Sequence, residues 1–265
     1  MSNFNRVKSA IWYSDQHFPH HDPHCLDVVE QLIQYENPDI LINGGDTVDA
    51  CQVSEKFSID PMMREWLQDD IDQAAQHLAY YKSLLKRGAT AHYLLGNHEN
   101  RLEKAIENAT GPRKEIVRLR VFQEHVTWEK IMADAGVGNW RIYGYGYQDQ
   151  IQIVPNLITK HGTKLSQHSA YTGAAELRQH GRSGISGHIH RMGLHYKSDA
   201  GGNHVWAEGG CCCILQPKYM QATPNWQHGC WVIHYTNDWF NMTPVFIQDG
   251  YARYNKEDFY ATTAL

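Results

Sequence analysis

Short apolar runs alternate with amphipathic stretches in the first third of the chain. Residues 8–14, 39–42 and 91–95 are typical of buried strands, and residues 23–35 have the spacing of an amphipathic helix. The clearest helical pattern covers residues 61–87, where apolar residues recur at steps of three and four and Gly88 follows as a stop signal. This order predicts parallel strands connected by helices.

The pattern changes beyond a charge-rich helical stretch that runs from Glu99 to about Ala135. From Trp140 onward short β-like runs dominate, interrupted by one helix over about 169–180. The sequence therefore predicts an α/β fold in which a βαβ-rich half and a β-rich half form two layers of a single domain, residues 1–265. The expected strands of the second half are 151–154, 157–160, 183–186, 193–197, 204–208, 211–215, 230–235 and 239–247.

Composition narrows the classes of function. The 265 residues are 42% hydrophobic and 20% charged, which suits a packed globular domain. A formal net charge of −5 excludes a uniformly basic surface for coating nucleic acid, although a local basic strip remains compatible with it. Histidine is the commonest metal ligand, so the 17 histidines call for a search for a metal site.

Hydropathy and the spacing of the cysteines indicate the cellular compartment. The chain has no apolar run of about 18 residues, and residues 1–8 lack the features of a signal peptide. Its six cysteines include no CxxC pair and no disulfide-framework spacing. We therefore expect a reduced, cytoplasmic protein with no membrane partner and no obligate protein partner; if a phage encodes it, the compartment is the host cytoplasm.

Five polar segments follow predicted strands directly. Ligands gather at strand ends in open α/β sheets because several loops converge there. The sequence thus predicts one site assembled from residues that are as many as 175 positions apart. The segments are Asp15-Gln16-His17, Gly45-Asp46-Thr47-Val48-Asp49, Gly96-Asn97-His98-Glu99, His161-Gly162 and Gly187-His188-Ile189-His190.

The residue types in these segments favour two metal ions. Asp15 and His17 are two positions apart, as are His188 and His190, so on extended backbone each pair points the same way. The donors are nitrogen and oxygen without thiolate, which suits Mn, Fe or Zn better than a soft metal. The carboxylate of Asp46 has two oxygens able to bridge two ions. Paired ions about 3.5–4 Å apart are the usual device for displacement at phosphorus.

The motifs DxH, GDxxD, GNHE, HG and GHxH, in this order, resemble those of the calcineurin-like metallophosphoesterases over roughly residues 8–235. GDTVD and GNHE resemble the phosphoprotein-phosphatase branch, whereas GHIH resembles the nuclease and phosphodiesterase branch. The overall layout is similar to uncharacterised phage and bacterial phosphoesterases. The resemblance implies a β-sandwich flanked by helices, with metals at one edge.

The resemblance also implies a role for each motif residue. The implied cofactors are two divalent metal ions, with Mn as the first choice and Fe, Zn or Ni as alternatives. His98 would protonate the leaving group, and Asp49 would orient His98 through a hydrogen bond. One metal would be held by Asp15, His17, Asp46 and His190, and the other by Asp46, Asn97, His161 and His188, with Asp46 bridging.

The chain departs from the phosphoprotein-phosphatase form at Ala50, where that branch has an arginine that contacts phosphate. Arg191 and Arg101 are the alternative candidates for binding the substrate phosphate. Residues 99–150 lie between motifs and are expected to form a substrate-selecting cap. They contain a basic strip over 101–120 and an aromatic run, Trp140, Tyr143, Tyr145 and Tyr147, for which solvated and core-packing roles are the simpler interpretations.

The resulting hypothesis is a metal-dependent phosphoesterase whose partner is a phosphate ester, with phosphodiester bonds of nucleotides or nucleic acid favoured. The alternatives are a phosphomonoesterase acting on phosphoprotein or a small ester, and a non-catalytic, metal-stabilised interaction module. Cys211, Cys212 and Cys213 are expected to be buried small hydrophobes in a strand, since neighbouring strand residues point to opposite faces.

Overall fold

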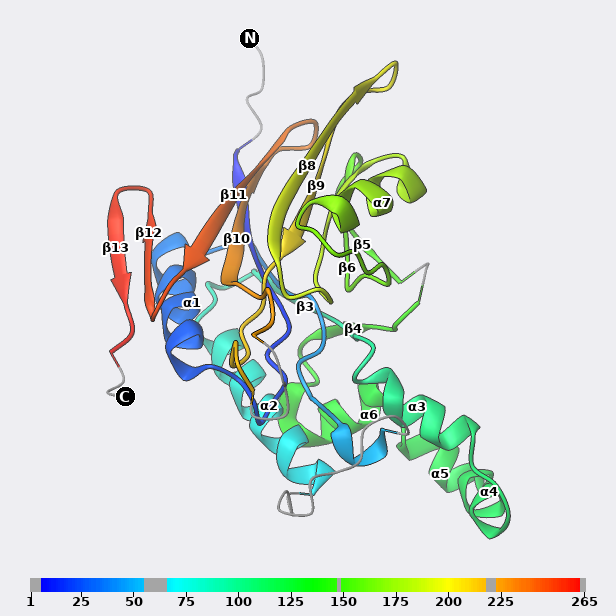
Figure 1. The fold of residues 1–265 in the computed structure, drawn as a ribbon. Helices are drawn as coiled ribbons and strands as arrows, with labels where there is room; N and C mark the ends of the chain where they lie inside the picture. Colours follow the sequence, from blue (N-terminus) through cyan, green and yellow to red (C-terminus); the bar gives the residue numbers. More distant parts are fainter. Residues whose placement is uncertain (1–5, 55–65, 147–148, 218–222, 263–265) are drawn as a thin grey trace.

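The computed structural model describes residues 6–54, 66–146, 149–217 and 223–262. Two sheets pack face to face, and helices cover the outer face of each, so the chain folds into four layers (Figure 1). This is the two-layered sandwich flanked by helices that the sequence predicts. No helix within the described residues is long and apolar enough to span a bilayer.

The larger sheet has the strand order β11-β10-β1-β2-β3-β4. Strands β1 to β4 are parallel, as the βαβ pattern predicts, whereas β10 and β11 add to the β1 edge in antiparallel fashion. The bounds are β1 (Lys8–Tyr13), β2 (Ile40–Asn43), β3 (Thr90–Leu94), β4 (Arg141–Tyr143), β10 (His228–Tyr235) and β11 (Phe240–Ile247).

The smaller sheet has the order β5-β6-β7-β9-β8, in which β6, β7 and β9 are parallel and the outer strands are antiparallel to their neighbours. A separate hairpin, β12 (Tyr251–Tyr254) with β13 (Glu257–Tyr260), packs near the first helix. The bounds in the smaller sheet are β5 (Ile151–Val154), β6 (Leu157–Lys160), β7 (Ser183–Ser186), β8 (Met192–Asp199) and β9 (Gly202–Gly209).

The helices divide between the outer faces and a projecting arm. Helices α1, α2 and α6 cover the larger sheet and α7 covers the smaller one, whereas α3, α4 and α5 project away from both sheets (Figure 1). The bounds are α1 (Pro23–Glu36), α2 (Leu67–Ser83), α3 (Asn100–Glu107), α4 (Pro112–Val117), α5 (Arg120–His125), α6 (Trp128–Met132), α7 (Tyr171–His180), a short 3₁₀ turn (Cys51–Val53) and a π turn (Ala133–Val137).

Strand β1 shows how the core is divided. Its residues alternate, so Ala10 and Trp12 enter the layer between the sheets while Ile11 and Tyr13 enter the layer beneath the helices. All four are fully buried. Trp12 also donates its indole N–H to the hydroxyl of Thr159 at 2.7 Å, which joins the two sheets and satisfies the one polar group of that side chain.

Three segments differ from the sequence pattern or refine it. The helix expected over 61–87 is present as α2 from Leu67 to Ser83, and residues 61–65 lie outside the described residues. The charge-rich stretch divides into short helices, with Gly111 at φ 58° between α3 and α4. The strand expected over 211–215 is wrong: Cys211 and Cys213 make only isolated bridges to different partners, so no ladder is continued.

Candidate metal centre

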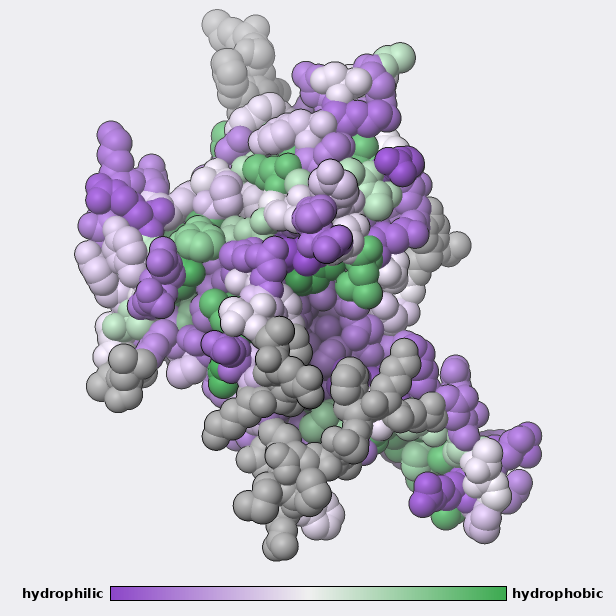
Figure 2. Space-filling view, viewed as in Figure 1, coloured by the Kyte–Doolittle hydropathy of each residue, from purple (hydrophilic) through white to green (hydrophobic). Residues whose placement is uncertain are grey.

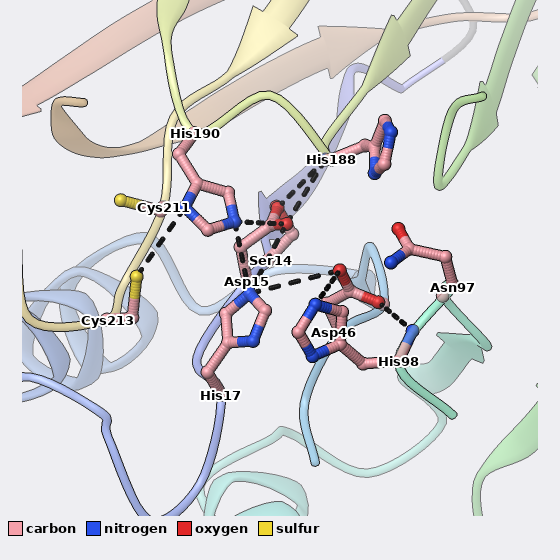
Figure 3. A network of polar contacts seen from close by, with 12 residues as sticks. Ser14, Asp15, His17, Asp46, Asn97, His98, His188, His190, Cys211 and Cys213 are labelled. Atoms are coloured by element: carbon pink, nitrogen blue, oxygen red, sulfur yellow. Dashed lines mark hydrogen bonds and ion pairs between the residues drawn. The ribbon is translucent and has the colours of Figure 1, made fainter. Parts of the chain in front are cut away.

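The five polar segments meet at one edge of the sandwich. They follow the carboxyl ends of β1, β2, β3, β6 and β7, which come from both sheets. Figure 3 shows side chains from these loops pointing toward one another. Figure 2 shows a recess lined with hydrophilic side chains in the middle of the face drawn in Figure 1. The convergence expected from the sequence is therefore present.

Several of the converging residues have left-handed backbone. The φ angles are 56° at Asp15, 53° at His17, 50° at Asp46, 73° at His188 and 57° at His190. Such conformations are costly for residues with a Cβ and concentrate at functional sites. They are supported here by hydrogen bonds between loops: the N–H of Asp15 donates to the carbonyl of Gly45 at 2.9 Å, and the N–H of His17 donates to that of Asp46 at 3.0 Å.

The first group of donors, called site 1, consists of Asp15, His17, Asp46 and His190, all buried. The Nε2 atoms of His17 and His190 lie 3.0 Å apart, and His190 Nε2 lies 3.2 Å from Asp15 Oδ1. Asp46 Oδ2 is 3.9 Å from His17 Nε2. Two imidazole nitrogens and two carboxylates thus face one another at separations that a single cation between them would satisfy.

The second group, site 2, consists of Asp46, Asn97, His161 and His188. His161 Nε2 lies 3.3 Å from Asp46 Oδ2 and 3.2 Å from Asn97 Oδ1. His188 belongs to the same group of donor atoms as Asp46 and His161, and its buried Nδ1 has no hydrogen-bond partner in the described structure. A buried nitrogen without a hydrogen-bond partner, beside a carboxylate and an imidazole, is a suitable metal donor, so this donor set fits a second metal ion.

Asp46 connects the two groups through one oxygen. Its Oδ1 accepts the backbone N–H of His98 at 2.8 Å, which leaves Oδ2 as the oxygen nearest both His17 and His161. Gly96 makes this possible because a Cβ there would clash with Oδ1 of Asp46. The loop after β3 thus holds Asp46 with Oδ2 turned toward both groups of donors.

The pKa values of His161 and His188 shift in opposite directions because of burial and the charged groups around them. Burial lowers the pKa of His161, but the charge and hydrogen bond of Asp46 outweigh burial and raise it to about 9. Burial together with the charge of His161 lowers the pKa of His188 to about 4. The buried carboxylates thus stabilise positive charge at this centre, such as metal ions bound there would supply.

His98 and Asp49 lie next to the two groups. His98 Nδ1 is 2.9 Å from Asp49 Oδ1, and His98 Nε2 points toward the centre, 3.9 Å from Asp46 Oδ2. Asp49 Oδ1 is also 3.0 Å from His17 Nδ1. Burial raises the pKa of Asp49, but hydrogen bonds from His17 and His98 hold it well below the usual range. Asp49 thus orients two imidazoles.

The two candidate arginines differ in position. Arg101 lies in the centre: one guanidinium nitrogen is 2.9 Å from His98 Nε2, and the other donates to the carbonyl of Asp49 at 2.7 Å. Arg191 instead donates to the carbonyls of Ser166 and Gln167. The structure therefore places Arg191 as a tether for the loop before α7, with its guanidinium directed at backbone oxygens.

Sequence reasoning assigned no role to Glu99, which the structure places at a hub. Its fully buried carboxylate accepts the backbone N–H groups of Asp46, Thr47, Val48 and Gly96 at 2.7–3.1 Å, and the Tyr93 hydroxyl at 2.7 Å. These contacts fasten the loop after β2 to the loop after β3. The signal was present, since Glu99 is the last residue of the GNHE motif.

Cys213, Trp226 and Tyr145 also lie beside the two sites, a position that the sequence did not predict for them. Cys213 is buried, as expected, but its Sγ lies 3.8 Å from His190 Nδ1. The ring of Trp226 packs edge-on against His190 with centroids 4.3 Å apart, and Tyr145 packs against His161 at 5.9 Å. The expectation that the cysteines serve only as hydrophobes is thus incomplete for Cys213.

The segment 99–150 is only partly exposed. Trp128, Met132 and Trp140 are buried in the core beneath the larger sheet, whereas Ile116, Leu119 and other residues of the α4–α5 arm are exposed. Tyr147 lies outside the described residues. The helices α3 to α5 begin directly after the GNHE motif, and most of their charged side chains are exposed.

Comparisons with known proteins identify the family of the chain. The chain is 24% identical over 234 residues to the Gene 54 protein of Mycobacterium phage D29, covering 84% of this chain and 87% of that protein. Similar solved structures are Vps29 from Cryptosporidium parvum (11% identity, 96% and 98% coverage, TM-score 0.48) and a dimetal phosphatase from Danio rerio (10% identity, 96% and 99% coverage, TM-score 0.46). The sequence model of the calcineurin-like phosphoesterases matches residues 11–192, and the chain therefore belongs to the calcineurin-like phosphoesterase family.

Proposed function

We propose that this chain is a dinuclear metal-dependent phosphoesterase that hydrolyses phosphodiester bonds of nucleotides or nucleic acid. The observation that carries the proposal is the position of Asp46 Oδ2 between two sets of nitrogen and oxygen donors. Paired divalent ions bound to such sets supply an activated water and neutralise charge on phosphoryl oxygens. Mn is the first choice of metal, because nitrogen and oxygen donors suit it.

His98 is proposed as the general acid. Its Nδ1 is held by Asp49, which leaves Nε2 toward the centre where a leaving oxygen would lie. The proton for that oxygen is carried at Nε2. Asp49 keeps the ring in this orientation, since its Oδ1 lies 2.9 Å from Nδ1.

Arg101 is proposed to bind the substrate phosphate. Its guanidinium is a fixed cation beside His98 Nε2, and a phosphate oxygen would be a stronger acceptor for it than a neutral imidazole. Moving Arg101 onto the phosphate would also release Nε2 to face the leaving group. Arg101 would thus supply the contact that Ala50, buried and apolar, does not supply.

The preference for diesters rests on the surroundings of the centre. The arm α3–α5 extends from the GNHE motif and has exposed cationic side chains, so a polyanionic strand is a suitable ligand. Trp226 and Tyr145 place aromatic rings against ligand histidines of both sites, where bases could stack. The arm would act as the substrate-selecting cap. The exposed cationic residues of the arm are Lys104, Arg113, Lys114, Arg118 and Arg120.

The test compares bis-p-nitrophenyl phosphate with p-nitrophenyl phosphate, using the full chain loaded with Mn²⁺. We expect faster hydrolysis of the diester, and loss of both activities in Asp46→Asn. A clear preference for the monoester would assign the chain to phosphomonoesterases. Activity of His98→Ala equal to that of the unaltered chain on both esters would favour a non-catalytic, metal-stabilised interaction module.

A further inference from the structure

The ligand histidines present a common arrangement. In His17, His161 and His190 the Nε2 atom faces the donors of the proposed centre, and the Nδ1 atom faces a neighbouring group. For His17 that neighbour is the carboxylate of Asp49 at 3.0 Å, and for His161 it is the carbonyl of Gly44 at 2.8 Å. Oxygen acceptors of this kind fix the tautomer and the ring orientation of a metal-binding histidine.

His190 has sulfur where the other two have oxygen. Its Nδ1 lies 3.8 Å from Cys213 Sγ, within hydrogen-bonding range for a sulfur acceptor. Figure 3 shows the two nitrogens of His190 directed to opposite sides, one toward Asp15 and His17 and the other toward Cys213. We propose that Cys213 is a positioning residue of site 1: its sulfur accepts the Nδ1–H of His190 and thereby directs Nε2 to the metal.

Backbone contacts fix the sulfur in this place. The N–H of Cys212 donates to the carbonyls of Ser14 and Asp15, both at 3.1 Å, and the N–H of Ile214 donates to that of His20 at 2.9 Å. The carbonyl of Cys213 lies 2.6 Å from His228 Nε2. The residue is therefore anchored on both sides to the loop that contains the DxH motif, and its side chain is 3% exposed.

Direct ligation by Cys213 is the competing interpretation, because His17, His190 and Cys213 form one group of donor atoms. The two nitrogens of an imidazole point in divergent directions within the ring plane. Nε2 is the nitrogen 3.2 Å from Asp15 Oδ1, so Nε2 would be the one to hold an ion, and Nδ1 is the one that faces the sulfur. The geometry thus favours a hydrogen bond over a metal–sulfur bond.

The inference rests on the proposed dinuclear centre and is tested by metal binding, which does not require turnover. Mn²⁺ is titrated into the metal-free full chain against a competing fluorescent chelator. Cys213→Ala is expected to weaken the affinity of one of the two ions by about 10-fold to 100-fold. Cys213→Ser, which keeps an acceptor, is expected to recover most of that loss. Cys212→Ala, a neighbouring buried cysteine that packs in the helix-covered core, serves as the matched control.

Two results would overturn the proposal. The first is unchanged Mn²⁺ affinity at both sites in Cys213→Ala. The second is a thiolate-to-metal charge-transfer band in the Co²⁺-loaded chain that disappears in Cys213→Ser, because such a band requires sulfur in the coordination sphere. A chain that binds two ions normally but hydrolyses no ester would contradict the proposed function alone, because the Mn²⁺ titration of Cys213→Ala tests the role of Cys213 without turnover.

Discussion

Asp49 Oδ1 lies 3.0 Å from Nδ1 of His17, a proposed ligand of site 1. The same oxygen lies 2.9 Å from Nδ1 of His98, the proposed acid. One carboxylate thus contacts both the imidazole proposed to bind a metal and the imidazole proposed to donate a proton. In this chain, changes at Asp49 should affect metal affinity as well as the rate of the chemical step.

The first prediction concerns Asp49→Asn. The amide that replaces the carboxylate keeps one acceptor oxygen but has no negative charge, so it holds the rings of His17 and His98 less firmly. We therefore expect kcat to fall by about 10²-fold or more. The affinity for one Mn²⁺ ion should fall by roughly 10-fold. Steady-state kinetics and chelator titration measure the two effects, with the exposed Asp238→Asn as control. A loss of kcat with unchanged metal affinity would restrict Asp49 to orienting His98.

The second prediction concerns Arg101→Ala. Removing a charge-assisted contact to phosphate should lower kcat/KM by about 10-fold to 100-fold. Arg101→Lys keeps the charge but not the planar fork, and should recover only part of the loss. The exposed Arg113→Ala on the arm is the control with a small diester. If Arg101→Ala keeps full kcat/KM on bis-p-nitrophenyl phosphate, Arg101 does not bind the phosphate.

The third prediction concerns Glu99→Gln. All five donors around this carboxylate require an acceptor, and an amide NH₂ would face N–H groups instead. We expect the free energy of unfolding to fall by roughly 2–3 kcal/mol. Urea denaturation of the metal-free chain measures this, beside Glu103→Gln, which alters an exposed glutamate of the same segment. Equal midpoints for the two variants would show that Glu99 does not hold the loops.

The fourth prediction is a dependence of stability on pH through His77. Burial, together with the charge of His21, lowers the pKa of His77 to about 3. The ring packs against Tyr81, Phe18 and Tyr13. Because the unfolded chain takes up this proton near pH 6.5, the contribution of neutral His77 is complete above that pH and is lost as pH falls toward 3.

His77→Phe removes this titration while keeping an aromatic ring. Between pH 7.5 and 4.5 the unaltered chain should lose about 2–3 kcal/mol more unfolding free energy than His77→Phe. The measurement is urea denaturation at both pH values, with the exposed His125→Gln as control. The same pH dependence in the unaltered chain and His77→Phe would mean that His77 is not held neutral.

Much of the fold could be predicted because its signals are local. The apolar runs of β1, β2 and β3 and the amphipathic spacing of α1 each act within a few residues. The sequence also predicted that the seven metal-ligand candidates lie close together, since the carboxyl ends of parallel strands meet at the same edge of a sheet. Their roles as ligands stay a prediction.

The remaining contacts join loops that are distant along the chain. The sequence suggested Arg191 as a contact for the substrate phosphate. In the structure Arg191 instead donates to carbonyls of the loop before α7, and this contact depends on how that loop returns to the sheet. Cys213 meets His190 because the segment after β9 pairs with single residues on either side rather than forming a strand. Such pairings leave no periodic pattern in the sequence. The spacing of side chains alone therefore predicted a strand at Cys213, where the structure has only isolated bridges.

The left-handed backbone at Asp15, His17, Asp46, His188 and His190 has a consequence for engineering. A set of donors copied onto another scaffold as side chains would relax to right-handed or extended backbone, and the imidazoles would turn away from one another. What must be transplanted is the pair of sheets together with the interlocked loops between them. A minimal peptide made of the five segments should therefore fail to reproduce the site, and successful redesign should begin from the sandwich and vary the arm.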